Sequence, residues 1–132
     1  MPTVTLKRAF RCDIADLWRL VTDLSCQSWR HGLAEVEALS PGEFTERTSG
    51  GFVTRFTVTA REEHRRWEFD LENENICGHW SGVFSVRGPV CEFESTETIR
   101  VKRALMRPFA RAYLRSQQRR YMADLQRALS RR

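Results

Sequence analysis

The residue best suited to chemistry in this sequence is Glu97, which lies where apolar and polar residues alternate. Its parity matches that of Phe93, Ile99 and Val101, so on a strand its carboxyl group shares their inward face. A carboxyl group among apolar side chains is costly to ionise, and the resulting raised pKa suits general acid or base catalysis. Two alternatives stay open: a bulge or strand end that breaks the alternation, or an ion pair with an arginine of the C-terminal segment.

Five further polar residues occupy positions from which they can hydrogen-bond the polar end of a ligand. They are Thr54, Ser95, Tyr113, Gln117 and Tyr121. The alternative is that each is a polar group of the core whose hydrogen bonds are satisfied within the protein.

The histidines and cysteines show no metal-binding pattern. His31, His64 and His79 are far apart, and simple alternation points His79 away from the inward face. No CxxC pair, glycine-rich phosphate loop, HExxH or GxSxG motif is present, so we expect no metal and no cofactor. The cysteines are expected to be free thiols in a reducing compartment. They are Cys12, Cys26, Cys77 and Cys91.

The elements that position these residues are mostly strands. Residues 3–10 alternate as a half-buried strand, and residues 14–23 have the spacing of a short amphipathic helix. Ser25 can cap a second short helical turn that carries Trp29. Further alternating segments, separated by turn residues, predict an antiparallel sheet of about six to seven strands. They cover residues 34–39, 44–48, 52–59, 64–71, 79–87 and 91–101.

From about Leu105 to Leu129 the spacing becomes helical, and Pro108 falls in the first turn, where a proline is tolerated. This helix is long enough to cross the sheet, at about 35 Å. We expect its inward stripe to contain Ala110, Tyr113, Leu114, Gln117, Tyr121, Leu125 and Ala128.

The predicted inward face of the sheet is strongly aromatic. Its members are Phe52, Phe56, Trp67, Phe69, Trp80, Phe84 and Phe93. One helix covers only part of a large twisted sheet, so these rings either close into a core or leave a cavity beneath the helix.

At this point the chain resembles the START-like or Bet v 1-like superfamily, which includes polyketide cyclases. Asp13-Ile14-Ala15-Asp16-Leu17-Trp18-Arg19-Leu20-Val21-Thr22-Asp23 followed by Trp29 is similar to that family's opening motif, with mild departures at Asp13 and Leu17. The resemblance implies a helix-grip α+β fold: a curved antiparallel sheet around a long C-terminal helix, with two short helices after strand 1. It also implies a hydrophobic ligand between sheet and helix, in proteins whose activities range from lipid carriage to ring cyclisation and co-chaperone binding.

Length and composition fit a single domain, residues 1–132, with 41% hydrophobic and 30% charged residues. No apolar run has the roughly 18 residues of a membrane span, and the N-terminal segment lacks the apolar stretch of a signal peptide. We therefore expect a cytoplasmic protein without a transmembrane segment. The sequence does not decide whether the protein forms a homodimer.

The positive charge is concentrated at the C-terminal end. Residues 102–132 contain ten basic residues and one acid, Asp124, whereas the rest of the chain is mildly acidic. One interpretation is an anionic partner, such as nucleic acid, the ribosome or an acidic membrane surface. The sequence favours the other, a solvated helix face partly neutralised by Glu72, Glu92 and Glu94. No aromatic residue alternates with the arginines, which argues against nucleic acid.

These observations favour non-covalent binding of a hydrophobic small molecule, such as a lipid, an isoprenoid quinone or a polyketide-like compound. The aromatic face would wall the cavity, Thr54, Ser95 and Glu97 would line it, and Tyr113, Gln117 and Tyr121 would cover it. One alternative is an enzyme, a cyclase or dehydratase that uses Glu97 as acid or base. Another is an interaction module that binds an acidic partner through the arginine-rich helix.

Overall fold

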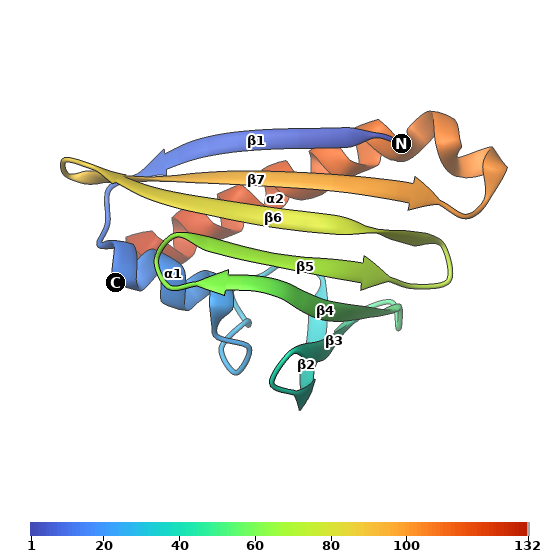
Figure 1. Ribbon diagram of the computed structural model, residues 1–132, viewed down its shortest axis with the longest axis horizontal. Helices are drawn as coiled ribbons and strands as arrows, with labels where there is room; N and C mark the ends of the chain where they lie inside the picture. The colour runs from blue at the N-terminus through green and yellow to red at the C-terminus, as the bar shows by residue number, and fades with distance from the viewer. Residues whose placement is uncertain (132) are drawn as a thin grey trace.

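The computed structural model describes residues 1–131, which form one antiparallel sheet, one short helix and one long helix (Figure 1). The strands pair in the order β1-β7-β6-β5-β4-β3-β2, so every consecutive pair from β2 to β7 is a hairpin and β1 joins beside β7. The strands are β1 (Thr3–Phe10), β2 (Leu33–Ser40), β3 (Glu43–Thr48), β4 (Val53–Glu62), β5 (Arg66–Glu72), β6 (Ile76–Arg87) and β7 (Val90–Val101).

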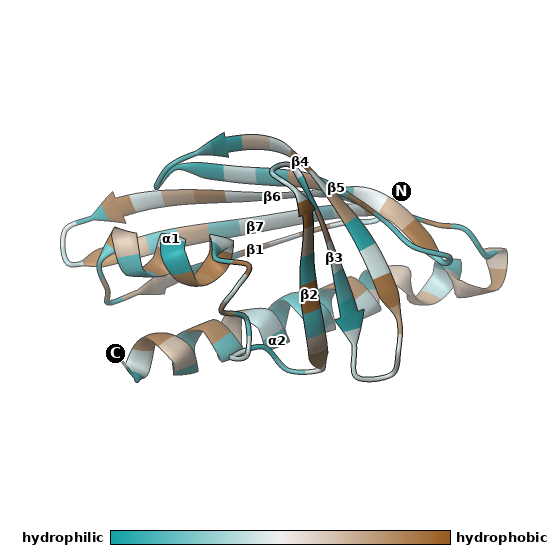
Figure 2. Ribbon diagram, turned by 90° about the horizontal axis from the view of Figure 1, so that it is seen from below, coloured by the Kyte–Doolittle hydropathy of each residue, from teal (hydrophilic) through white to brown (hydrophobic). Residues whose placement is uncertain are grey.

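The helices come from the two segments with helical spacing. Helix α1 (Ile14–Thr22) follows β1, and a 3₁₀ helix η1 (Ala104–Phe109) leads into α2 (Ala110–Ser130). Helix α2 packs mainly against β1 and β7, while β2 and β3 curl steeply toward it from the other edge (Figure 2). The α+β class, the seven strands and the long C-terminal helix confirm the predicted fold. No helix within residues 1–131 is both long and apolar enough to cross a membrane.

The predicted second helix after β1 is wrong. Residues 24–30 form turns, because the Asp23 carboxylate accepts hydrogen bonds from the backbone N–H and the hydroxyl of Ser25, at 3.0 and 2.6 Å. Such a side-chain turn competes with helical backbone bonding. Gln27 then caps the C-terminal end of α1, where its side-chain amide donates hydrogen bonds to the backbone oxygens of Leu20 and Asp23. A single helix therefore separates β1 from β2.

The main core lies between α1, the C-terminal half of α2 and the inner face of β3–β7. Trp18 of α1 packs edge-on against Phe84, with ring centres 5.1 Å apart, and Phe84 stacks on Phe93 at 4.7 Å. A smaller apolar cluster, which includes Leu114, Ile99 and Val101, joins the N-terminal half of α2 to β1 and β7. The main cluster also includes buried rings of β3–β5, although α2 itself packs mainly against β1 and β7.

Candidate functional site on the inner face of the sheet

The strand register places nearly all the predicted lining residues of the sheet on its inner face, yet most of them are core. The buried members pack ring against ring, as in the stacked pair of Phe44 and Phe56 at 4.8 Å and the edge-on pair of Trp67 and Trp80 at 6.0 Å. Trp80 also donates from Nε1 to the Ser95 hydroxyl at 2.8 Å. The buried set is Phe56, Trp67, Trp80, Phe84, Phe93 and Ser95.

A second group on the same inner face remains partly exposed. These residues face the helix side of the sheet or approach it from α2 and from the loop after α1, and each is only partly buried. Apolar and polar side chains are mixed in this group. Its members are Val36, Glu46, Thr54, Val58, Phe69 and Glu97 from the sheet, with Trp29 and Arg30 from the loop after α1 and Tyr121 from α2. We refer to them as the open inner face.

An ion pair in the open inner face joins the loop after α1 to β3. Arg30 donates two hydrogen bonds to the Glu46 carboxylate, 2.7 and 3.0 Å long. Its guanidinium group also lies over the Tyr121 ring, 5.4 Å from the ring centre, and Trp29 meets that ring edge-on at 5.3 Å. Burial raises the pKa of Tyr121, so its hydroxyl stays protonated and available as a donor.

Glu97 lies on the inner face, as its parity predicts, opposite Val4 on β1 and Trp80 on β6. Within residues 1–131 its carboxyl group has no hydrogen-bond or ion-pair partner. Burial, and then the negative charge of Glu46, raise the pKa of Glu97 to about 7. The alternative of an ion pair with an arginine of the C-terminal segment is therefore not found among the described residues, and Glu97 exchanges its proton near neutral pH.

The remaining predicted residues lie at the margin of this face. Tyr113 and Gln117 of α2 are exposed, Tyr113 by 53%, and the Gln117 amide donates to the Tyr113 hydroxyl at 2.8 Å. Burial raises the pKa of Tyr113, and the negative charge of Glu97 raises it further. Phe52 precedes β4 and is also exposed. The buried stripe of α2 runs through Ala110, Leu114, Gln118, Met122, Leu125 and Leu129.

The sequence interpretation missed Arg30 and Glu46. Glu46 has the parity of Phe44 on β3, so the alternation contained the signal that it faces inward. Arg30 lies in a loop, where no periodicity indicates the direction of its side chain.

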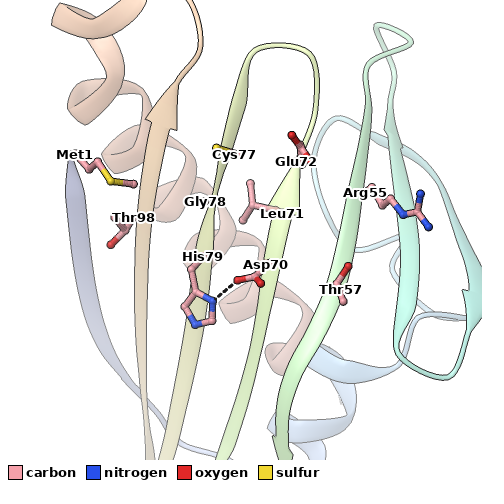
Figure 3. Close-up of a pocket in the computed structure, with 10 residues that line it drawn as sticks. All are labelled: Met1, Arg55, Thr57, Asp70, Leu71, Glu72, Cys77, Gly78, His79 and Thr98. Atoms are coloured by element: carbon pink, nitrogen blue, oxygen red, sulfur yellow. Dashed lines mark hydrogen bonds and ion pairs between the residues drawn. The ribbon is translucent and has the colours of Figure 1, made fainter.

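The outer face of the sheet has a separate depression of about 450 Å³ (Figure 3). His79 lies there, as predicted, between two carboxylates: its Nδ1 is 2.7 Å from Asp70 and its Nε2 is 2.8 Å from Glu68. Burial lowers the pKa of His79, but the two carboxylates outweigh this and raise it above its ordinary value. Its wall combines charged side chains, among them Arg55 and Glu72, with the apolar Met1 and Leu71. Within residues 1–131 no group of histidine, cysteine and acidic side chains is placed to hold a metal ion, and the four cysteines are free.

The sequence profile of the family described as "Polyketide cyclase / dehydrase and lipid transport" matches residues 1–130. The chain belongs to this family. No curated protein sequence matches it. Family membership implies hydrophobic-ligand binding in general, which agrees with an aromatic inner face that the terminal helix covers only in part.

Solved structures show the same fold at low sequence identity. A START superfamily protein from Mycobacterium smegmatis superposes with a TM-score of 0.88 at 11% identity, over 98% of this chain and 97% of that one. A Mesorhizobium loti protein gives 0.82 at 16% identity, over 98% and 97%. A protein in the dynemicin biosynthetic locus gives 0.81 at 13% identity, where the match spans 98% of this chain but only 48% of that chain. These likenesses establish the helix-grip fold alone.

Proposed function

We propose that the protein binds a hydrophobic small molecule, such as a lipid, an isoprenoid quinone or a polyketide-like compound, on the open inner face. One observation carries this proposal: Val36, Val58 and Phe69 face the helix side of the sheet and yet remain partly exposed. Partly exposed apolar surface gains free energy when a ligand removes it from water, at about 25 cal/mol per Å². The family description, which includes lipid transport, supports the same conclusion.

The polar groups of this face favour a ligand whose polar end is neutral. Glu46 already neutralises Arg30, so no unpaired cation is offered to a carboxylate or phosphate group. Glu97 would repel an anion whenever it is ionised. Protonated Glu97 and the Tyr121 hydroxyl can instead donate to a carbonyl, ether or hydroxyl oxygen. Trp67 Nε1, which is buried and has no acceptor in the described residues, is a further donor.

The first experiment is native mass spectrometry of the protein as purified from cells, followed by denaturing extraction of any bound compound. A titration with the neutral apolar dye N-phenyl-1-naphthylamine then tests the location. Val58→Trp should obstruct the open inner face and abolish dye binding, whereas Thr57→Trp, on the outer face of the same strand, should leave it unchanged. Equal binding by the two variants, with folding verified by circular dichroism, would place the ligand elsewhere.

A second candidate function is a cyclase or dehydratase in which Glu97 moves a proton on a bound polyketone. It is favoured by one observation, the pKa of about 7 on a carboxyl group without a partner in the described residues. A group that titrates near the operating pH is the most effective acid or base. With a linear polyketone as substrate, Glu97→Gln should abolish turnover and leave substrate affinity nearly intact. Turnover that survives the substitution would remove Glu97 from the mechanism.

A further inference from the structure

The arginines of η1 and α2 are not neutralised by the sheet. Expected partners of the helix are engaged elsewhere: Glu92 with Lys7 and Arg87, and Glu72 with Lys102. The physical reason is the strand parity, since even-numbered residues of β7 lie on the outer face, away from α2. Within residues 1–131 six consecutive arginines of this region make no ion pair. They are Arg103, Arg107, Arg111, Arg115, Arg119 and Arg120.

Three large apolar side chains are exposed among the first of these arginines. Leu105 is 87% exposed, Met106 52% and Phe109 63%, and no residue of η1 is buried. Single exposed apolar residues are ordinary. Three within five positions form a cluster, and its exposure to water does not stabilise a monomer. The exposure therefore needs a partner that is itself apolar.

The cluster and the arginines share one end of the molecule. In Figure 1, η1 lies beyond the end of β7, opposite the β4–β5 and β6–β7 turns. On α2, Arg111, Arg115 and Arg119 each follow a residue of the buried stripe, which turns them about 100° away from the sheet. We define Arg103, Leu105, Met106, Arg107, Phe109 and Arg111 as the basic-apolar tip. Among nearby acids, Glu72 is paired with Lys102, and Glu74 lies in the adjacent β5–β6 turn.

We propose that the basic-apolar tip docks the protein on the surface of a bilayer that contains anionic phospholipids. The apolar side chains would enter the boundary between headgroups and acyl chains, and the arginines would contact the phosphates. Both the apolar side chains and the arginines of the tip fit this partner. Nucleic acid fits only the charged half, because Leu105 and Met106 cannot stack on bases and would remain in water. The inference stands independently of the ligand on the open inner face.

The test is cosedimentation of the full chain with vesicles of phosphatidylcholine that contain about one-third phosphatidylglycerol, compared with pure phosphatidylcholine vesicles. Binding should require the anionic lipid and weaken with salt. Each Arg→Gln substitution at Arg103, Arg107 or Arg111 should weaken binding about fivefold. The pair Leu105→Ser and Phe109→Ser should weaken it by about tenfold or more, because their burial in the bilayer is lost.

The matched control is the double variant Arg65→Gln and Arg87→Gln, which removes one charge from the β4–β5 turn and one from the end of β6, at the opposite end of the molecule, and should bind like the wild type. Circular dichroism verifies that every variant is folded. Failure to bind anionic vesicles at low salt would overturn the proposal, and so would equal loss in the control. Binding that needs the arginines but not Leu105 and Phe109 would also overturn it. In that case, tight binding of a DNA duplex would identify nucleic acid as the partner instead.

Discussion

Arg30 and Glu46 connect the loop after α1 to β3 through two hydrogen bonds, beside Tyr121 of α2. Their side chains are only 21% and 16% exposed, so the pair is partly withdrawn from water. It holds the loop across one end of the open inner face and presents the Arg30 guanidinium to the Tyr121 ring. The shape of the candidate site therefore depends on this contact.

Replacing Arg30 with Met should destabilise the protein by about 2 kcal/mol, because it leaves a partly buried Glu46 carboxylate unpaired. Urea unfolding at pH 7 measures the effect. The control is Arg47→Met, which breaks the exposed pair of Arg47 and Glu35, with side chains 47% and 55% exposed, and should cost less than about 1 kcal/mol. Equal costs would mean that the Arg30 pair is an ordinary surface contact.

Glu97 should make stability fall as the pH rises. Its pKa is raised in the folded state, from 4.5 to about 7, so its favourable contribution is complete below pH 4.5 and is lost as the pH passes 7. Glu97→Gln should match the wild type near pH 4.5 and exceed its free energy of unfolding at pH 8 by on the order of 2 kcal/mol.

The control for this measurement is Glu94→Gln, on the outer face of the same strand, which should keep the wild-type pH dependence. A pH profile of Glu97→Gln parallel to that of the wild type would show that the carboxyl group is already well solvated.

Asp124 should have the opposite effect to Glu97, so that its contribution to the free energy of unfolding is lost as the pH falls. It is a buried residue of α2 that accepts hydrogen bonds from the backbone and the ring of His31, at 2.8 and 2.9 Å, and from Arg127. Burial raises the pKa of Asp124, but these donors outweigh it and hold the pKa below its ordinary value. Its contribution is thus present above about pH 4 and lost as the pH falls through the folded-state pKa.

Asp124→Asn should therefore cost about 2 kcal/mol at pH 7 and progressively less toward pH 3, measured by urea unfolding. Asp70→Asn, which removes an exposed partner of His79, should cost less than about 1 kcal/mol at pH 7. A cost for Asp124→Asn that does not change with pH would refute the assigned role of the charge.

Gly82→Ala should destabilise the core by about 2 kcal/mol or more. A Cβ atom at this position would lie 2.4 Å from the Trp80 ring and 2.9 Å from the Phe93 ring, both of which are held by buried neighbours. Gly42→Ala, whose Cβ atom would meet no atom within 4 Å, should change stability by less than about 0.5 kcal/mol. Differential scanning calorimetry of both variants separates the two outcomes, and similar melting temperatures would indicate that the Trp80 ring is free to move.

Local periodicity in the sequence was sufficient to predict the strands, the first helix and the long terminal helix. The same alternation placed Glu97 on the inner face and His79 on the outer face, because a side chain on a strand has only two directions. Hairpin order then followed from short turns between neighbouring strands. These features depend on residues close together in the chain.

Only the tertiary structure decided which inward residues are covered. Tyr113 and Gln117 were predicted to face the sheet, but α2 packs against β1 and β7 through Leu114 and Gln118. At these turns the observed buried stripe is therefore shifted by about one residue from the predicted stripe. The division of the aromatic face into buried and partly exposed residues, and the pairing of Arg30 with Glu46, likewise depend on where separate elements meet. Whether an inward side chain is buried depends on how far its strand lies from the helices and loops that pack on the sheet. The periodicity within one element contains no information about those distances.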